Sequence, residues 1–587
     1  MADVLPAPVQ DSVPLQDATT LSSSSTPSDR PDSHTQRYDR QLRLWAKSGQ
    51  AALESARLLV VGANGTATQT LKNLVLPGIG HFTLLSPTES VTPSDLGANF
   101  FLSPSSLGKP LAPEAVAHLL ELNDTVSGTP LTAPVSSLTE EQVGSHTLVI
   151  AVDVEDPAEA GRIAEMCWKR GVPYMRVQSV GFFGTLRTQV EELCIVETHP
   201  SSLVDLRIHA PFPALLAFAT SPEFDYAQLD SEKHGHVPAV VILVKALEEW
   251  KASHTGALPT STADRKAFAA LVLSHKRQSD EENFDEAVTL FRRAGVKANV
   301  PADVEALFND PACENVTKES SNFWLLLHAV RTFVRSPAGG GLLPLSGALP
   351  DMKASSLSYV ALQQLYKSKA RQDADEVERL VRELEAKLGG EGMKGRVTRE
   401  EVETFVKHAA WVRVVRGRSI AEEERESKLA SKTGAILSNA SFQTPPDLSL
   451  HLYTALRASS LFFASHARYP GDGVSSPEEL EKDAAELEGL ARGLLSGWKG
   501  EEDWAGVGVE EEGVWEKLGE VCREITRTPP GTTLPQTSAL LGGLVAQEAI
   551  KLVTRQYVPL GTTLGGGGGG ETAIWDGVRS GVGVLDA

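Results

Sequence analysis

Short apolar runs alternate with amphipathic stretches in the first part of the chain. Each of three runs is typical of a buried strand, namely LLVV, FTLL and LVIAV, and helical patterns separate them. The helix expected after LVIAV is well delimited, because Asp156 can cap it, Pro157 suits its first turn and Gly171 can end it. Residues 37–199 are therefore predicted to form an α/β domain with a parallel sheet and crossover helices.

The pattern changes at about residue 200, where long helical periods replace the strand signals. One such helix is predicted over DADEVERLVRELEAKLGG, and Gly389 can end it. Its apolar stripe consists of Val377, Leu380, Val381, Leu384 and Leu388. Residues 200–530 are predicted to be a large, mainly α-helical insertion.

The two ends of the chain carry different signals. Residues 1–36 are rich in Ser, Pro, Thr and Asp with few apolar anchors, so they are predicted to be a disordered tail. Residues 531–587 return to a packed helix, SALLGGLVAQEAIKLVT, and then to a strand-like run. Gly542, Gly543 and Ala546 would let this helix pack closely, which places it against the first domain. The GGGGGG run that follows is predicted to be a flexible loop.

Composition narrows the class of protein. With 587 residues the chain is long enough for several domains, and its formal net charge of -21 argues against a general nucleic-acid binder, which needs a basic face. No apolar run is long enough for a membrane span, and the first residues do not have the pattern of a leader peptide. We expect a soluble protein of the cytoplasm or nucleus, with no nucleic-acid or membrane partner.

The cysteines are far apart and form no CxxC pair, so they predict neither a disulfide framework nor a structural zinc site. They are Cys167, Cys194, Cys313 and Cys522. Three of them follow helical or strand-like patterns beside apolar residues, as buried small hydrophobic side chains do. Cys313 lies in a loop-like stretch, NDPACENVTK, where Asp310 and Glu314 would disfavour a thiolate. No catalytic cysteine is predicted.

A glycine-containing turn follows the first strand, where backbone N–H groups and a helix dipole could converge on phosphate. The expected G-x-G-x-x-G pattern reads GANGTA from Gly62 to Ala67, so only the first glycine is kept in register. Asn64 replaces the second glycine, which lets the backbone approach phosphate closely. Ser86 stands at the position where an acidic residue is expected to bind ribose. We interpret this turn, which includes Gly65, as a degenerate nucleotide loop that now has a structural role. This interpretation argues against an NAD-dependent oxidoreductase.

Several stretches, in order along the chain, resemble one family. RYDRQLRLW, followed by a strand, a turn and LKNLVLPGIG, resembles the ThiF-type adenylation domain of ubiquitin-like modifier-activating enzymes and their bacterial sulfur-carrier relatives. Further matches narrow it to the regulatory subunits of neddylation activating enzymes, namely NFFL, DEENFDEAV, LFNDPACENVTK, LPLSGALPDM and LGGLVAQEAIKLVTRQYVP. The resemblance covers about residues 37–559 and implies a Rossmann-like adenylation domain interrupted by a large, mainly α-helical insertion domain.

The active members of this family use Mg-ATP to adenylate the C-terminal glycine of a small modifier and then pass it to a catalytic cysteine. Against their pattern, Ala98 replaces a phosphate-contacting arginine and Leu111 replaces a lysine, although Lys109 lies nearby. Asp153 matches the metal-associated aspartate, but the asparagine expected after it is Val154. The resemblance therefore implies no catalytic residue, no metal and no bound cofactor in this chain, and Mg-ATP used by a partner subunit.

The resemblance gives the basic N-terminal motif a role in the partner. Adenylation domains of this family work in pairs, and the arginine at the position of Arg40 reaches the ATP held by the other subunit. A guanidinium suits this task, because its fixed fork and permanent charge match phosphate oxygens. Arg37 and Arg43 are expected instead to form surface ion pairs with Asp39 and other acids, while Trp45 packs into the core.

These observations predict a regulatory subunit of the heterodimeric activating enzyme for the neddylation modifier. It would bind the catalytic subunit, complete its ATP site with Arg40, and help to shape the surface where the ubiquitin-like modifier and the carrier enzyme dock. Two alternatives stay open. One is a self-sufficient adenylating homodimer, for which Asp153 and Lys109 are the best arguments, and the other is a non-catalytic adaptor. The regulatory subunit for the sumoylation modifier is disfavoured, because it lacks so large a helical insertion.

Overall fold

The structure, a computed structural model, describes most of the chain. The described residues are 32–197, 205–294, 299–389, 392–425, 429, 432–443, 446–499, 504–528, 534–560, 571–579 and 581–586. The GGGGGG run lies outside them, as does the predicted tail up to residue 31. The end of that predicted tail is helical, because Asp32 caps a short helix over Ser33–Arg37.

In the described part of the chain, an eight-stranded sheet is accompanied by a separate two-stranded one. The strands are β1 (Arg57–Val61), β2 (His81–Ser86), β3 (Ser127–Thr132), β4 (Leu148–Val152), β5 (Tyr174–Val180), β6 (Phe183–Gln189), β7 (Glu192–Ile195), β8 (Arg413–Arg416), β9 (Glu571–Asp576) and β10 (Gly581–Asp586). The large sheet has the order β10-β9-β6-β5-β4-β1-β2-β3. Its pairs from β3 to β5 are parallel and those from β5 to β10 antiparallel, whereas β7 pairs with β8.

Helices account for most of the remaining described residues. They are α1 (Ser33–Arg37), α2 (Asp39–Ser55), α3 (Gly65–Val75), α4 (Pro93–Ala98), α5 (Leu111–Leu120), α6 (Glu140–Gly144), α7 (Pro157–Lys169), α8 (Pro213–Ala219), α9 (Ser231–His234), α10 (Ala239–Ser253), α11 (Thr262–Ser274), α12 (Glu282–Ala294), α13 (Ala302–Phe308), α14 (Pro311–Glu314), α15 (Asn322–Arg335), α16 (Ser356–Gly389), α17 (Arg399–His408), α18 (Ile420–Arg425), α19 (Thr433–Ser441), α20 (Ser449–His466), α21 (Pro477–Lys499), α22 (Glu511–Arg527) and α23 (Pro535–Thr554). Among the described residues, no helix combines the length and the apolar character needed to cross a bilayer.

Helices bury both faces of β1 and β4, the central strands of the parallel part of the sheet. Along β1, Leu58 and Val60 join a core with α3, α5 and α23, whereas Leu59 and Val61 join a core with α6 and α7. Burial on both faces explains why these strands read as continuous apolar runs rather than alternating ones. The predicted α/β fold is confirmed, and we call the large sheet with these helices the sheet domain.

The predicted limits of α7 are confirmed. Asp156 caps the helix, its Oδ1 accepting the N–H of Ala158 at 2.8 Å, and Pro157 occupies the first turn. Gly171 follows the helix with a φ of +62°, a conformation in which glycine carries no Cβ penalty. This cap, first-turn proline and final glycine were all readable in the sequence.

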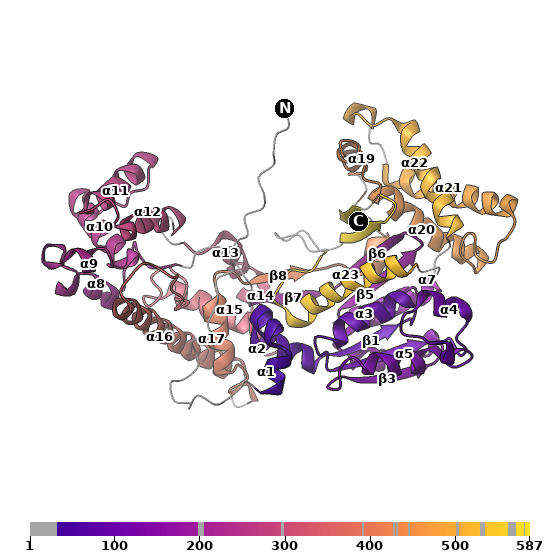
Figure 1. The fold of residues 1–587 in the computed structure, drawn as a ribbon, viewed down its shortest axis with the longest axis horizontal. Coiled ribbons are helices and arrows are strands. Elements are labelled where there is room, and N and C mark those ends of the chain that lie inside the picture. Colours follow the sequence, from indigo (N-terminus) through magenta and orange to yellow (C-terminus); the bar gives the residue numbers. More distant parts are fainter. Residues whose placement is uncertain are drawn as a thin grey trace.

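The C-terminal helix α23 lies against α3, side by side in the sheet domain (Figure 1). A Cβ on Gly542 would lie 2.6 Å from the Cβ of Gln69, so the two backbones approach closely only because this residue is glycine. Ala546 is buried in the same core. The packing expected of these two residues is confirmed, whereas Gly543 faces open space and is not needed for it.

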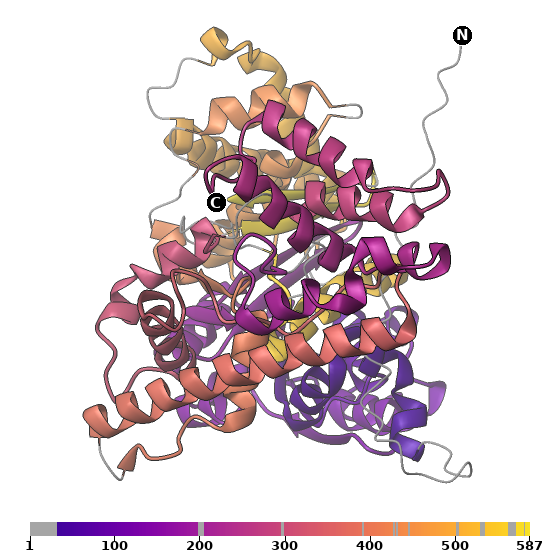
Figure 2. The ribbon, with the colours of Figure 1, turned by 90° about the vertical axis from the view of Figure 1, so that its left-hand side faces the viewer.

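Residues 200–530 form two groups of helices rather than one. The first helical lobe comprises α8–α17 and the second helical lobe α19–α22, and Figure 1 shows them on opposite sides of α23. Between them, β8 pairs with β7 and α18 packs on α7, so the chain returns briefly to the sheet domain. In Figure 2 the long helix α16 crosses the first lobe in front of the sheet domain. Its predicted stripe includes the fully buried Val377 and Val381.

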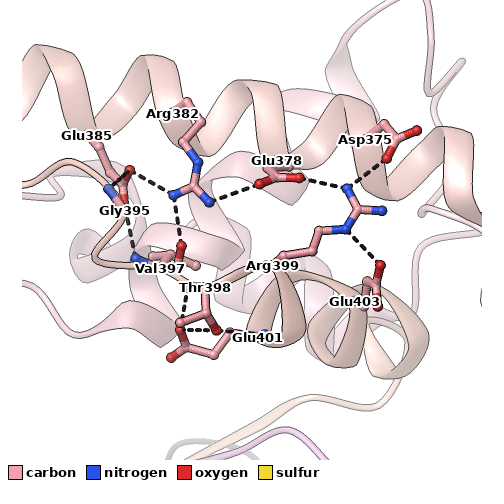
Figure 3. Close-up of polar contacts among 10 residues, drawn as sticks. All are labelled: Asp375, Glu378, Arg382, Glu385, Gly395, Val397, Thr398, Arg399, Glu401 and Glu403. Atoms are coloured by element: carbon pink, nitrogen blue, oxygen red, sulfur yellow. Dashed lines mark hydrogen bonds and ion pairs between the residues drawn. The ribbon is translucent and has the colours of Figure 1, made fainter.

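A network of charged side chains joins α16 to α17 (Figure 3). Arg399 on α17 contacts Asp375 and Glu378 of α16 and Glu403 of its own helix, each at 2.7 Å. A shared cation of this kind costs less side-chain entropy per contact than separate pairs would. The network therefore fixes α17 along the second half of α16.

Glu385 is the buried member of this network, with a side chain only 2% exposed. It accepts hydrogen bonds from Arg382 Nη1 at 3.0 Å and from the backbone N–H groups of Gly395 at 3.1 Å and Val397 at 2.9 Å (Figure 3). A buried carboxylate satisfied by three donors is strongly held. Glu385 thus ties the turn after α16 back onto the helix.

Replacing Glu385 by alanine should release this turn. The substitution leaves the backbone N–H groups of Gly395 and Val397 without an acceptor, at a cost of about 1.5–3 kcal/mol, whereas Arg382 keeps its contacts with Val397 and Glu378. We expect amide hydrogen exchange at Gly395 and Val397 to become about tenfold to a hundredfold faster. The half-exposed Glu383, which pairs with Arg379 on the same helix, provides the matched control. Glu383→Ala should leave these amides unchanged, and equal protection in both variants would contradict the anchoring role.

His451 is a buried titratable group of the second helical lobe, 3% exposed on α20. Burial lowers its pKa to about 4, and the positive charges of Lys517 on α22 and Arg579 after β9 act in the same direction, while Asp447 opposes them. An unfolded chain would bind a proton there below its ordinary pKa of 6.5. The folded state therefore loses stability as pH falls from 6.5 toward 4, by up to about 3 kcal/mol.

The substitution His451→Leu should make unfolding less sensitive to acid. We expect the free energy of unfolding, measured by chemical denaturation from pH 7.5 to 4.5, to fall less steeply in this variant than in the parent protein. The exposed His236 serves as control, and His236→Gln should keep the parent's slope. Identical slopes for all three proteins would show that His451 does not contribute to the acid sensitivity.

Candidate functional site

One glycine and one asparagine shape the loop between β1 and α3. Gly62 has a φ of +98°, and a Cβ there would lie 2.1 Å from the carbonyl oxygen of Val152 at the end of β4, so only glycine fits. Asn64 caps α3, its Oδ1 accepting the N–H of Ala67 at 3.1 Å. One of the free N–H groups at the N-terminus of α3 is therefore already bonded to the side chain of Asn64.

Asp153 follows β4 and closes the other side of the loop. Its carboxylate accepts hydrogen bonds from Asn64 Nδ2 and from the N–H of Ser179, both at 2.6 Å, and also from the Ser179 hydroxyl. Burial raises the pKa of Asp153 to about 6, although the hydrogen bonds from Ser179 and Asn64 act in the opposite direction. The carboxylate at the family's metal-associated position thus holds the loop to the end of β5.

The end of α4 lies over the N-terminus of α3. A Cβ on Gly65 would lie 2.4 Å from the carbonyl oxygen of Ala98, the residue at the position of the family's phosphate-contacting arginine. The buried Asn99 accepts a hydrogen bond from Thr68 Oγ1 at 2.9 Å and donates one to the carbonyl oxygen of Ala63 at 3.1 Å. These contacts hold the end of α4 against the loop between β1 and α3.

The other positions of the degenerate site are also engaged within the chain. Ser86 is buried at the end of β2, and its hydroxyl accepts the N–H of Thr88 at 3.2 Å. Leu111 begins α5 and belongs to the hydrophobic core. Lys109 lies 3.2 Å from Glu114, so this cation has a counter-ion nearby.

Burial makes the cysteine thiols poor nucleophiles. It raises the pKa of Cys167 and Cys522 to about 12, and that of Cys194 is also raised. Burial raises the pKa of Cys313 to about 11. The prediction that Cys313 lies in a loop is wrong, because this residue lies on α14 with no exposed surface. Asp310 caps that short helix, its Oδ1 accepting the N–H of Ala312 at 2.9 Å. Over the described ranges, no group of three or more His, Cys, Asp or Glu side chains is arranged to hold a metal ion.

Arg40 is an exposed side chain in the first turn of α2. Within the described residues it forms no hydrogen bond and no ion pair. Its neighbours differ, because Arg37 lies 2.6 Å from Asp124 and Arg43 lies 3.1 Å from Asp39. The surface ion pairs predicted for Arg37 and Arg43 are confirmed, which leaves Arg40 as the uncompensated cation of the motif.

Two serines that hold the loop were not expected from the sequence. Thr66 Oγ1 lies 3.3 Å from Ser179 Oγ and 3.2 Å from Ser538 Oγ. Ser179 lies near the end of β5, beside β4, which is followed by Asp153. The rule that carboxyl ends of neighbouring parallel strands meet could have indicated Ser179. Ser538 comes from α23, and only the folded arrangement brings it here.

Comparisons with known proteins agree with this architecture. A family model of the ThiF family matches residues 38–565. The chain is 35% identical over 542 residues to the NEDD8-activating enzyme E1 regulatory subunit of Danio rerio, with 90% of this chain and 96% of that protein covered. It is 33% identical over 548 residues to the Nedd8-activating enzyme E1 regulatory subunit of Drosophila melanogaster, with 92% and 97% covered. It is 32% identical over 529 residues to the NEDD8-activating enzyme E1 regulatory subunit AXR1 of Arabidopsis thaliana, with 89% and 93% covered.

These matches extend over the sheet domain and both helical lobes. They agree with the resemblance found in RYDRQLRLW and in the later stretches of the chain. The chain therefore belongs to the ThiF family and, within it, to the group of NEDD8-activating enzyme E1 regulatory subunits.

Proposed function

We propose that this chain is the regulatory subunit of a heterodimeric NEDD8-activating enzyme, and that it completes the ATP site of the catalytic subunit with Arg40. The observation that carries the proposal is the state of Arg40, an exposed guanidinium without an internal partner in a motif whose other arginines, Arg37 and Arg43, are paired. A guanidinium on a folded helix can meet phosphate oxygens with its fork geometry intact.

In this proposal the chain itself binds no nucleotide. The residues of the loop after β1 fit a triphosphate poorly, because the Oδ1 of Asn64 and the carbonyl oxygen of Ala98 lie at the helix N-terminus, where an anion needs N–H donors. The nearby Asp153 is a further acceptor, and Lys109 is paired with Glu114. Mg-ATP is proposed to be held by the partner subunit.

The helical lobes are proposed to help shape the surface on which the ubiquitin-like modifier and the carrier enzyme dock. Their position on opposite sides of α23 supports this role (Figure 1). Their cysteines, Cys313 and Cys522, are buried with raised pKa values, so the lobes suit binding rather than thioester chemistry. For this role we propose a location in the cytoplasm or nucleus, which are reducing compartments in which cysteines stay unpaired.

Modifier-dependent exchange between ATP and pyrophosphate tests the partnership. We expect exchange with NEDD8 as substrate only when this chain and the catalytic subunit are combined, because neither alone holds a complete ATP site. The two proteins are assayed separately and together at equal concentrations. Exchange by this chain alone would establish a self-sufficient enzyme, and full exchange by the catalytic subunit alone would reduce this chain to an adaptor.

The substitution Arg40→Ala tests the residue that carries the proposal. Loss of a charge-assisted phosphate contact should lower modifier adenylation by the heterodimer by about tenfold to a hundredfold without preventing assembly. Assembly is checked by size-exclusion chromatography, and Arg43→Ala removes an exposed arginine of the same helix turn as a control. Unchanged ATP kinetics in an assembled Arg40→Ala heterodimer would remove Arg40 from the mechanism.

A further inference from the structure

The segment that carries Arg40 is a separate piece of helix. Helix α2 runs from Asp39 to Ser55, but Trp45 (φ −126°, ψ 21°) and Ala46 (φ 56°, ψ −175°) depart from helical geometry. The direction of the helix axis before Trp45 is therefore not determined by the direction of the axis after Ala46. It has to be set by contacts at the two ends of the segment, at Tyr38 and at Trp45.

Tyr38 anchors the first end. Its side chain is almost completely buried, and its hydroxyl lies 3.0 Å from Thr125 Oγ1 and accepts a hydrogen bond from Asn123 Nδ2 at 3.0 Å. A Cβ on Gly78, which has a φ of +89°, would lie 2.6 Å from this hydroxyl, so the tyrosine rests directly on the turn after α3. Both the ring and the hydroxyl of Tyr38 are thus held in one position.

Asn123 is the centre of this anchor. Its Nδ2 also donates to the carbonyl oxygen of Val75 at 3.0 Å, at the end of α3. Its Oδ1 accepts hydrogen bonds from Arg37 Nη1 at 3.1 Å and from the N–H of Thr125 at 3.2 Å. One buried amide therefore ties the last residue of α1, Arg37, and the junction residue Tyr38 to the sheet domain, and both of its polar atoms are used.

Trp45 anchors the second end. Its Nε1 donates to Gln50 Oε1 at 3.3 Å, and the amide of Gln50 donates to the carbonyl oxygen of Pro77 at 3.1 Å. The carbonyl oxygen of Trp45 accepts a hydrogen bond from Gln556 Nε2 at 2.8 Å, so residues just after α23 hold this end. As expected from the sequence, Trp45 is buried and belongs to the core.

We propose that Tyr38 and Asn123 are positioning residues that aim Arg40 at the partner's ATP. This inference rests on the proposed role of Arg40 and adds the residues through which the sheet domain directs it. Arg40 forms no hydrogen bond or ion pair of its own within the described chain, so the direction of its helix turn comes from the anchored ends of the segment, of which the buried Tyr38 lies two residues before Arg40. A cation presented in a fixed direction loses less conformational entropy when it meets phosphate than one on a mobile segment.

The substitution Tyr38→Phe tests this role, since it removes the hydroxyl and keeps the ring. In the assembled heterodimer we expect the KM for ATP to rise by about threefold to tenfold, the effect of one lost hydrogen bond, with the KM for NEDD8 unchanged. Tyr366→Phe is the matched control, because the Tyr366 hydroxyl is also buried and donates to the carbonyl oxygen of Leu206 at 2.6 Å in the first helical lobe. This control should leave the KM for ATP unchanged.

A double-mutant cycle separates positioning from plain stability. In an Arg40→Ala background, Tyr38→Phe and Asn123→Ala should have no further effect on the KM for ATP, because the group they aim is gone. An effect of equal size in both backgrounds would overturn the inference and leave a structural role. The inference would also be overturned if neither variant changed the KM for ATP in the parent protein while Arg40→Ala remained defective. That result would leave the proposed function intact. If Arg40→Ala itself has no effect on the KM for ATP, the proposed role of Arg40 is wrong, and the inference about Tyr38 and Asn123 fails with it.

Discussion

The close packing of α23 on α3 makes one domain from the two ends of the chain. Gly542 lacks the Cβ that would otherwise lie 2.6 Å from the Cβ of Gln69, and Ser538 reaches Thr66 at the start of α3. With α23 come β9, which pairs with β6, and Gln556, which holds the backbone of Trp45. The loop after β1, the sheet edge and the segment bearing Arg40 all depend on this one contact between distant parts of the chain.

The loop after β1 shows how a nucleotide-binding fold can be kept while its binding groups are used internally. A phosphate cradle needs free N–H donors and a backbone that lets phosphate approach. Here Asn64 caps the helix, Asn99 fastens α4 over it and Asp153 ties it to β5, so the polar groups satisfy one another. Such a network stabilises the fold, because buried polar groups left without partners are costly. In the proposed function, the group that meets phosphate is instead the surface residue Arg40.

Much of the sheet domain could be predicted from sequence, because its signals are local. The cap at Asp156 and the degenerate loop at Gly62 can each be read from a few neighbouring residues. The division of the helical region could not, since β8 is only four residues long and finds its partner β7 far back in the chain. The helix around Cys313 was missed for a related reason, because a single turn begun by Pro311 has no periodicity to detect. Ser538 reaches the loop only through the tertiary packing of α23 on α3, and its residue type alone gives no sign of that.

The strand order β10-β9-β6 has a consequence for how the chain is made. During synthesis β6 emerges before both helical lobes, whereas its partner β9 follows both of them in the chain. Until then the sheet presents an open edge, which is a template for wrong pairing with other chains. The edge of β6 therefore stays open for as long as both helical lobes are being translated. A chain that stops before β9 leaves that edge of β6 unpaired, which makes mispairing with other chains more favourable than in the complete sheet domain.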